Sequence, residues 1–278
     1  MIDSSLHCVY LCLNNSLISL DGINSISINK STSYDNGIFL GGQDMPLSLN
    51  QPDQISISID KSFVEHDPIQ SLTGSGKIDY LYYSDGLRYI EFKNLYMNNM
   101  QASFTVGDLP KVNFTLSSYN GHMVQLGSVN TSNKITFEKN IPKLDSIFIS
   151  SSNAQVANLI KTNIYMYSID YSVNINRQPY YSVGSYEEVE VCEILPIQVS
   201  ASITSKEKIN LTFTPLLLAE YQTMFYDFDI NIKGSGTSIT SFPMRKTKFI
   251  SFDKKSNSNG FADIKYNFNG LIGGYYGN

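Results

Sequence analysis

The stretch Tyr171-Ser172-Val173-Asn174, followed by Tyr181-Ser182-Val183-Gly184, Pro196 and Val199-Ser200-Ala201-Ser202-Ile203, sets the pattern of this chain. An alternating strand leads to a short stop and a glycine, and a spacer with a proline leads to a second alternating strand. The same layout occurs earlier as Ile26-Ser27-Ile28-Asn29, Ile38-Phe39-Leu40-Gly41, Pro52 and Ile55-Ser56-Ile57-Ser58-Ile59. Residues 26–59 and 169–203 therefore predict two similar β units.

A further pair of similar strands lies towards the end of each half. Val112-Asn113-Phe114-Thr115-Leu116 is similar to Ile264-Lys265-Tyr266-Asn267-Phe268. We interpret the repeat as a duplicated domain, with one β-sandwich in residues 1–125 and a second in 126–278. The join is expected within 120–133, where Asn, Gly and Ser gather. Duplication of a unit that lacks an evident catalytic group favours assembly over catalysis.

Alternation of apolar and polar residues is the dominant period. In Ile55–Asp60 the isoleucines share one face and Ser56, Ser58 and Asp60 the other, as in a half-buried antiparallel strand. Further strands are expected at 7–13, 78–83, 88–93, 101–106, 111–117, 134–138, 145–149, 187–192, 209–213, 225–232, 246–252 and 261–268. Turns are expected at Asp21-Gly22, Asn36-Gly37, Asp85-Gly86, Asn120-Gly121 and Asn259-Gly260.

The helical signal is thin and confined to 152–161 and 216–221. Many short strands with one or two short helices predict an all-β fold of two similar antiparallel β-sandwich or barrel-like domains. A chain of 278 residues is long enough to bury a core in either one large domain or two.

The charge of the chain limits its function. Only 16% of the residues are charged, against about 25% in ordinary domains. The formal net charge is −5 and the pI about 5.2. A protein that holds nucleic acid by neutralising phosphates would carry a basic surface, so this composition argues against one. It is compatible with a surface past which DNA slides.

Targeting and cysteine signals are few. Cys8 and Cys12 share one side of an expected strand, and with Cys192 they favour buried small apolar residues in a reducing compartment over a zinc site or a disulfide framework. Residues 1–7 lack a basic region and a long apolar region, so no secretory signal is expected. No apolar stretch approaches the ~18 residues of a membrane span.

Catalytic groups do not converge in the sequence. His7, His66 and His122 show no metal-ligand spacing, and Glu65-His66-Asp67-Pro68 is typical of a turn more than of an acid–base pair. No serine lies in a G-x-S-x-G elbow. Gly74-Ser75-Gly76 and Gly234-Ser235-Gly236 lack the lysine of a phosphate-binding loop.

The acidic run Glu187-Glu188-Val189-Glu190-Val191-Cys192-Glu193 is the densest charge feature. Paired carboxylates serve glycoside hydrolysis, and carboxylates with carbonyls bind calcium. Glu188 and Glu190 alternate with valines, however, which favours the solvated face of a strand. We therefore predict that the protein is not an enzyme and has no catalytic, cofactor-binding or metal site.

The stretch Arg177-Gln178-Pro179-Tyr180-Tyr181-Ser182-Val183-Gly184, with Pro196-Ile197-Gln198-Val199-Ser200-Ala201-Ser202 after it, resembles the tail tube proteins of tailed bacteriophages. Tyr89–Asn94, Ser103–Pro110 and Val112–Leu116 are similar to later strands of the same fold. Ile38–Gly41 with Pro52 and Ile55–Ile59 is a weaker copy, with Ser33, Tyr34 and Asp35 where Arg177 stands in the second.

The resemblance implies a structural virion protein, made in the host bacterial cytoplasm. It implies rings, trimers of duplicated domains or hexamers, that stack into a tube conducting DNA without binding it and that join other tail proteins. The inner sheets of neighbours would form one barrel. A baseplate hub or distal tail protein is the alternative, and a carbohydrate-binding β-sandwich module is the alternative from another class. A host-side adhesin would want a signal peptide.

Overall fold

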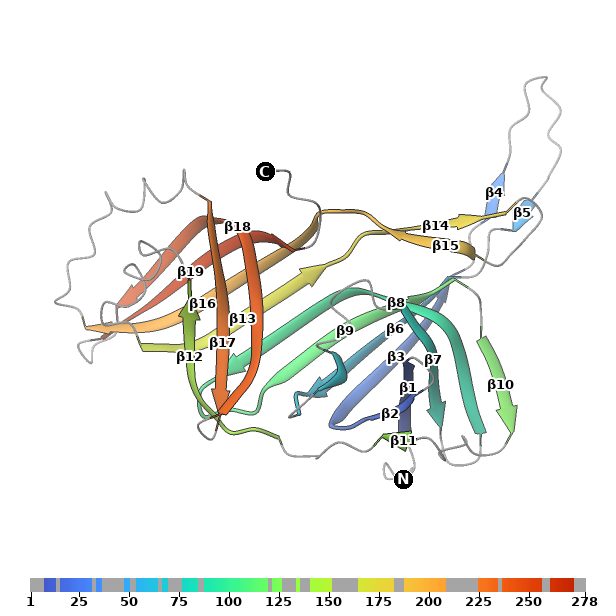
Figure 1. The fold of residues 1–278 in the computed structure, drawn as a ribbon, viewed down its shortest axis with the longest axis horizontal. Coiled ribbons are helices and arrows are strands. Elements are labelled where there is room, and N and C mark those ends of the chain that lie inside the picture. Colours follow the sequence, from blue (N-terminus) through green and yellow to red (C-terminus); the bar gives the residue numbers. More distant parts are fainter. Residues whose placement is uncertain are drawn as a thin grey trace, which may run out of the picture.

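The computed structural model places strands through most of the chain (Figure 1). The residues that it describes are 8–13, 16–31, 34–36, 48–50, 54–64, 67–69, 77–84, 88–119, 122–126, 134–135, 141–151, 165–182, 188–208, 225–234, 237–256 and 261–272. The expected helices at 152–161 and 216–221 and the expected strand at 209–213 lie outside these residues. The fold is all-β with antiparallel sheets, as the alternation predicts.

The strands of the first half are β1 (Cys8–Leu13), β2 (Ser16–Leu20), β3 (Ile23–Ser31), β4 (Tyr34–Asn36), β5 (Ser48–Asn50), β6 (Gln54–Ser62), β7 (Lys77–Ser84), β8 (Arg88–Thr105), β9 (Lys111–Ser118) and β10 (His122–Leu126). Those that follow are β11 (Lys134–Ile135), β12 (Leu144–Ser150), β13 (Tyr165–Asn174), β14 (Arg177–Tyr181), β15 (Glu188–Glu193), β16 (Ile197–Lys208), β17 (Tyr226–Gly234), β18 (Thr237–Ser256) and β19 (Phe261–Ile272).

Eight of these strands form one continuous layer, which we call the main sheet. Its order is β3-β6-β9-β8-β13-β16-β19-β18, and every neighbouring pair is antiparallel. The pairing of β8 with β13 joins the first half to the second. Figure 1 shows β13, β8 and β9 running side by side across the middle of the molecule.

Two long strands leave the main sheet and continue into covering layers. Residues Leu95–Ser103 of β8 pair with β9, whereas Tyr89–Tyr96 pairs with β7 and Arg88–Phe92 with β10. In β18, Arg245–Ser256 pairs with β19 and Thr237–Thr247 with β17. The separate strands expected at 88–93 and 101–106 are thus one strand, because the chain bends from one layer into the other without a turn.

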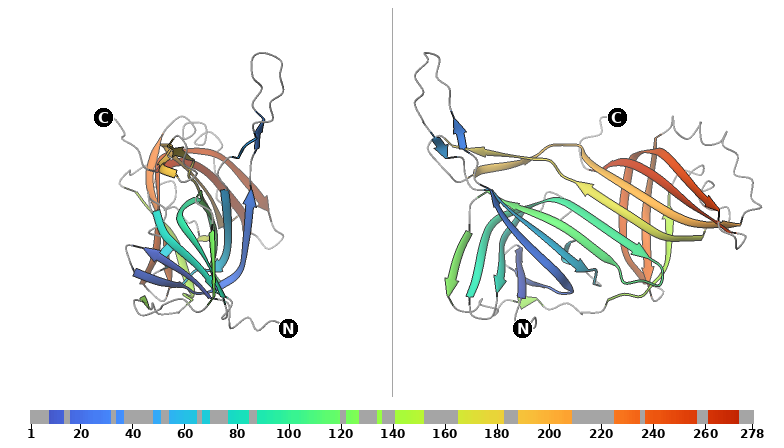
Figure 2. Two further views of the ribbon diagram at one scale, coloured as in Figure 1. Left: turned by 90° about the vertical axis from the view of Figure 1, so that its right-hand side faces the viewer. Right: turned by 180° about the vertical axis from the view of Figure 1, so that it is seen from behind.

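Covering layers pack over the main sheet in both halves. In the first half, β7 pairs with β1, β1 with β2, and β2 with the short parallel strand β11. In the second half, β17 pairs with β12. Apolar side chains from both halves form one core cluster, in which the ring of Phe242 contacts both Phe104 and Tyr171. The views in Figure 2 show the layers from the end and from behind.

The order of pairing recurs in the two halves. In the first, β3, β6, β9, β8 and β7 pair in sequence, and in the second β13, β16, β19, β18 and β17 do so. The division at 125 stays a prediction, since one sheet and one core run through both halves. The expected linker at 120–133 does contain a strand, because His122–Leu126 pairs with β8.

Short hairpins interrupt both halves at the corresponding place. The pair β4·β5 lies between β3 and β6 in the sequence, and the pair β14·β15 lies between β13 and β16. Both extend beyond the same end of the main sheet, as Figures 1 and 2 show. The alternating strands of the two predicted β units are therefore the strands that flank a projecting hairpin.

The predicted turn at Asp21-Gly22 is present between β2 and β3. Gly22 has a φ of 75°, which a residue with a side chain adopts rarely. Its carbonyl accepts a hydrogen bond from the Ser62 amide at 2.8 Å, and a Cβ here would lie 2.9 Å from the Ser62 carbonyl oxygen. Glycine thus lets the turn pack against the end of β6.

In the described part of the chain, no helix has the length and apolar character to cross a membrane.

Candidate assembly site on the main sheet

One face of the main sheet is polar from edge to edge. The alternation that buries Ile55, Ile57 and Ile59 turns Ser56, Ser58 and Asp60 to the other side. Cross-strand register then aligns such residues into transverse rows. The first row is Lys248, Asn269, Ser200, Ser172, Gln101, Asn113, Asp60 and Ser25. The second row is Ser251, Asn267, Ser202, Asp170, Ser103, Lys111 and Ser62.

Hydrogen bonds run along these rows. Ser103 Oγ donates to Asp170 Oδ1 at 2.8 Å, across the joint between the two halves. Ser202 Oγ donates to Asn267 Oδ1 at 2.9 Å, and Asn267 Nδ2 donates to Ser251 Oγ at 3.0 Å. These bonds satisfy side chains laterally, so the face is hydrated without presenting a concentrated charge.

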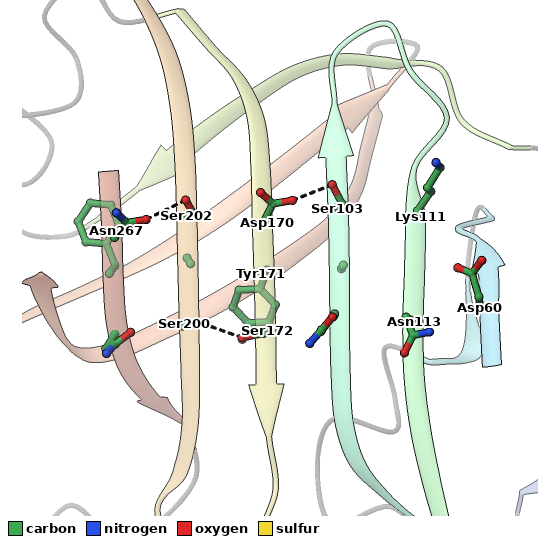
Figure 3. Close-up of a pocket in the computed structure, with 15 residues that line it drawn as sticks. Asp60, Ser103, Lys111, Asn113, Asp170, Tyr171, Ser172, Ser200, Ser202 and Asn267 are labelled. Atoms are coloured by element: carbon green, nitrogen blue, oxygen red, sulfur yellow. Dashed lines mark hydrogen bonds between the residues drawn. The ribbon is translucent and has the colours of Figure 1, made fainter. Parts of the chain in front are cut away.

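The rows border a shallow hollow of about 490 Å³ that spans β6, β9, β8, β13, β16 and β19. Figure 3 shows its polar side chains on neighbouring strands, with Asp60 and Lys111 at one end and Asn267 at the other. The two rows together hold two lysines and two aspartates, so their charges cancel. Shape and chemistry are those of an open polar trough more than of a ligand pocket.

The opposite face of the main sheet is apolar and covered. The row behind the hollow is Phe249, Phe268, Ala201, Tyr171, Ala102 and Val112, all of them buried. Burial raises the pKa of the Tyr171 hydroxyl, which donates to the Pro243 carbonyl at 3.3 Å. The sheet therefore has one face fixed by the core and one open to solvent.

A buried ion pair continues this apolar row. Lys61 lies opposite Val112, and its ammonium contacts the carboxylate of Asp67, with both side chains fully buried. Asp67 also accepts hydrogen bonds from the amides of Val64 and Ile69, each at 3.2 Å. Sequence reasoning missed this pair, although a lysine in phase with the buried isoleucines of β6 was a signal that it needs an anionic partner.

Arg177, the first residue of the motif resembling tube proteins, lies at the joint between the halves. Its Nε donates to the Met97 carbonyl at 3.1 Å, and its guanidinium lies 5.4 Å from the centre of the Tyr96 ring. Burial lowers the pKa of Arg177, and the charge of its cross-strand neighbour Glu193 opposes that shift. Arg177 thus anchors the base of the β14·β15 hairpin to the first half.

The main sheet ends in two strands with a neighbour on one side only. Among the described residues, β3 pairs with β6 alone, and the Ser251–Ser256 segment of β18 pairs with β19 alone. The β3 strand is nine residues long, is largely exposed and has a single charge, Lys30. A long strand of this kind at a sheet edge is a template for pairing with another chain.

The histidines singled out in the sequence are not brought together in the described structure. His122 lies in β10, opposite Phe92, while His7 and His66 lie outside the described residues. Within the described ranges, no group of three or more His, Cys, Asp or Glu side chains is placed to hold a metal ion.

Of the two Gly-Ser-Gly segments, only Gly234 lies within the described residues. It ends β17 against the Lys143 carbonyl oxygen, which would lie 2.4 Å from a Cβ at this position.

Residues Glu188–Glu193 of the acidic run form the second strand of the β14·β15 hairpin, and Glu187 lies outside the described residues. Glu190 is exposed opposite Tyr180, as a solvated strand face predicts.

The three cysteines form no disulfide. Cys8 and Cys12 do share one side of β1, on the other face from the buried Val9 and Leu11. All three cysteines are half-buried, so the expectation of burial was wrong for them.

Comparison with known proteins adds no relative: no family model matches the chain, and no curated protein is similar to it.

Proposed function

We propose that this protein is a structural virion protein, without catalytic activity, that forms stacked rings of a bacteriophage tail tube conducting DNA. The observation that carries the proposal is the main sheet itself. It joins two halves into one continuous surface, polar on one face and buried on the other, with an edge strand at each end. Repetition of such a sheet around an axis closes it, and closure removes the edges.

The dimensions support a conduit. Three copies of eight strands give a barrel of about 24 strands, which at ~4.8 Å between strands and a tilt near 40° measures roughly 45–50 Å between opposite backbones. Such a channel is wide enough for a nucleic-acid duplex. With the polar face inward, the wall presents Ser, Asn and Gln with balanced charges, so phosphates meet few uncompensated cations.

The projecting hairpins support stacking. Tyr180 and Tyr181 on β14, and Ile194 and Leu195 just after β15, are exposed apolar side chains beyond the end of the main sheet. Exposed apolar residues gathered in one projection mark a contact surface. In the proposed tube they contact the next ring or another tail protein.

The test is the mass and shape of the purified full-length chain. Light scattering after size exclusion is expected to give an oligomer, and negative-stain images are expected to show rings with a central hole that stack into tubes. Rings that never stack would favour the hub or distal tail role. A monomer at every concentration refutes the proposal, and glycan binding by that monomer would favour the carbohydrate-binding alternative.

A further inference from the structure

The two ends of the main sheet have counterparts that are already paired within the chain. The pairing of β6 with β9 in the first half recurs as the pairing of β16 with β19 in the second. Lys61, which lies opposite Val112, then corresponds to Ser205, which lies opposite Ile264. This alignment of β9 with β19 is the one that the two sequence strings predict. It makes β18 the counterpart of β8, and β3 the counterpart of β13.

A β-bulge verifies the correspondence of β8 and β18. The register of β8 against β9 shifts between Met97 and Asn99, and that of β18 against β19 shifts between Phe249 and Ser251. Opposite these bulges lie Leu116 and Phe268, which the alignment of β9 with β19 already equates. Residues 97–103 of β8 therefore correspond to 249–255 of β18.

The ends of β3 and β13 verify the other correspondence. Ile26 pairs with Ile59 as Ile169 pairs with Ile203, so Ile26 corresponds to Ile169. Comparison of the sequence strings alone aligns Ile26 with Tyr171, two residues later. On this count β3 ends at Ser31 and β4 begins at Tyr34, just as β13 ends at Asn174 and β14 begins at Arg177. The spacing between strand and hairpin is the same in both halves.

Within the chain, these counterparts pair with each other. The joint consists of β8 and β13, antiparallel, with Gln101 opposite Ser172 and Ser103 opposite Asp170. The counterpart of β8 is β18, at one end of the main sheet. The counterpart of β13 is β3, at the other end. They lie seven strand spacings apart, roughly 34 Å, so they cannot meet in one copy.

We propose that β18 of one copy pairs with β3 of the next, antiparallel and in the register of the internal β8·β13 joint. That register sets Ser251 opposite Ser31, Asp253 opposite Asn29, and Lys255 opposite Ser27. The partner is a second copy of this chain, and the contact is head-to-tail, so repetition produces a ring. The inference rests on the proposed function and names the contact that closes the ring.

Exposure at β3 supports the pairing. Ile28 is 37% exposed, whereas Tyr171, its counterpart in the internally paired strand, is 2% exposed. Ile28 thus lies on the apolar face of the sheet without the cover that its counterpart receives. In the proposed joint it lies opposite Lys254, whose aliphatic stem can cover it while the ammonium stays in water.

The residues at the proposed joint also disfavour other pairings. No like charges lie directly opposite in the β18·β3 register, whereas β18 paired antiparallel with a second β18, centred on Lys254 and Lys255, would bring the lysines of two copies together. The internal joint places the Arg177 guanidinium over the Tyr96 ring. Tyr34 and Lys248 occupy the two corresponding positions, so cation and aromatic ring exchange sides and the pair is retained in the sequence.

A disulfide tests the register. The Ile175 amide donates to the Asn98 carbonyl and the Val106 amide to the Tyr167 carbonyl, so alternation leaves Gln101–Ser172 and Ser103–Asp170 as non-hydrogen-bonded pairs. The pair Asp253–Asn29 is of the same kind, and its expected Cα separation of about 4.5 Å suits a disulfide.

We would therefore make Asn29→Cys with Asp253→Cys in a background where Cys8, Cys12 and Cys192 are replaced by alanine. Mild oxidation of assembled protein is expected to link copies covalently head-to-tail, giving a ladder up to a closed ring on a non-reducing gel. Ile28→Cys with Asp253→Cys places the thiols on opposite faces and is expected to stay unlinked. Linkage by Asn29→Cys alone, as a dimer, would show β3·β3 pairing and overturn the proposal.

A proline provides the second test. By the same alternation, the amide of Tyr171 points towards β8. The amide of its counterpart, Ile28, therefore points away from β6. Ile28→Pro removes an outward donor from an edge strand, a position that tolerates proline. The variant is expected to keep its circular dichroism spectrum and lose ring assembly, while Ile28→Thr keeps both. If wild-type protein assembles, Asn29→Cys with Asp253→Cys gives no cross-link and Ile28→Pro still assembles, the joint is overturned. The proposed function would then still stand. Absence of wild-type assembly would refute both.

Discussion

Arg177 donates a hydrogen bond to the backbone carbonyl of Met97 across the joint between the two halves. Met97 lies at the β8 bulge, beside Asn98, whose carbonyl accepts from the Ile175 amide at 2.8 Å. The first residue of a projecting hairpin is thus fixed to an irregular point of a strand 80 residues earlier. This contact explains in physical terms why an arginine begins the β14 motif.

Replacement of Arg177 is expected to destabilise the chain. Arg177→Ala removes the hydrogen bond to Met97 and the contact with the Tyr96 ring, which together are worth about 1–3 kcal/mol. Arg177→Lys keeps the charge but loses the planar stacking, so it should cost less. The midpoint of urea unfolding measures both, with Lys265→Ala, an exposed cation, as the control. Equal midpoints for Arg177→Ala and the control would contradict the anchoring role.

Lys61 and Asp67 are expected to be strongly coupled. Lys61→Met leaves a buried carboxylate without its cation, which costs about 3–5 kcal/mol. Lys61→Met with Asp67→Asn removes both charges and should recover most of that loss. The buried counterpart of Lys61 is Ser205, so this site accepts an uncharged residue in the other half. A double-mutant cycle by denaturant unfolding measures the coupling, and additive effects would contradict the pairing.

The polar face is expected not to retain DNA. Assembled wild-type protein should show no tight binding of duplex DNA at low salt, because the charges of its rows cancel. Gln101→Lys with Asn269→Lys adds cations beside the hollow, and binding should then appear and fall steeply with salt, by about 0.9 in log K per phosphate contact per log unit of salt. Ser146→Lys with Ser238→Lys, on β12 and on the part of β18 that pairs with β17 in the covering layer, is the matched control. Equal binding by the two variants would show that the polar face is not the wall of a conduit.

The thiol of Cys192 is expected to react slowly. Burial raises its pKa, and a hydrogen bond and the charge of Glu190 raise it further, so less thiolate is present at about pH 8. Glu190→Gln removes the charge and should speed alkylation of Cys192 by iodoacetamide, followed by mass spectrometry of its peptide. Asp145→Asn, an exposed and distant change, is the control. An unchanged rate in Glu190→Gln would contradict the electrostatic effect.

Glu190 is also expected to have no catalytic role. The side chain is exposed on a hairpin strand, and such surface charges contribute about 0–1 kcal/mol to folding. Glu190→Ala should therefore leave assembly almost unchanged, and neither it nor wild type should hydrolyse glycans or esters. A turnover that Glu190→Ala abolishes would refute the structural role.

Sequence alone was sufficient for the features that depend on a period of two. In a strand successive side chains point to opposite faces, so Ile55, Ile57 and Ile59 had to share the buried face whatever their partners were. The same period predicted the all-β fold, and the Asp21-Gly22 pair predicted the turn at Gly22. Each of these is decided by local backbone geometry.

Only the tertiary structure decided which strand edges meet. Nothing in the period of β8 shows that it passes through two layers, or that its last residues pair with β13 more than 60 residues later. The same holds for the Asp67 carboxylate beside Lys61 and for the Met97 carbonyl beside Arg177. Backbone hydrogen bonds are alike along every strand, so partner and register are chosen by core packing, which depends on the whole chain at once.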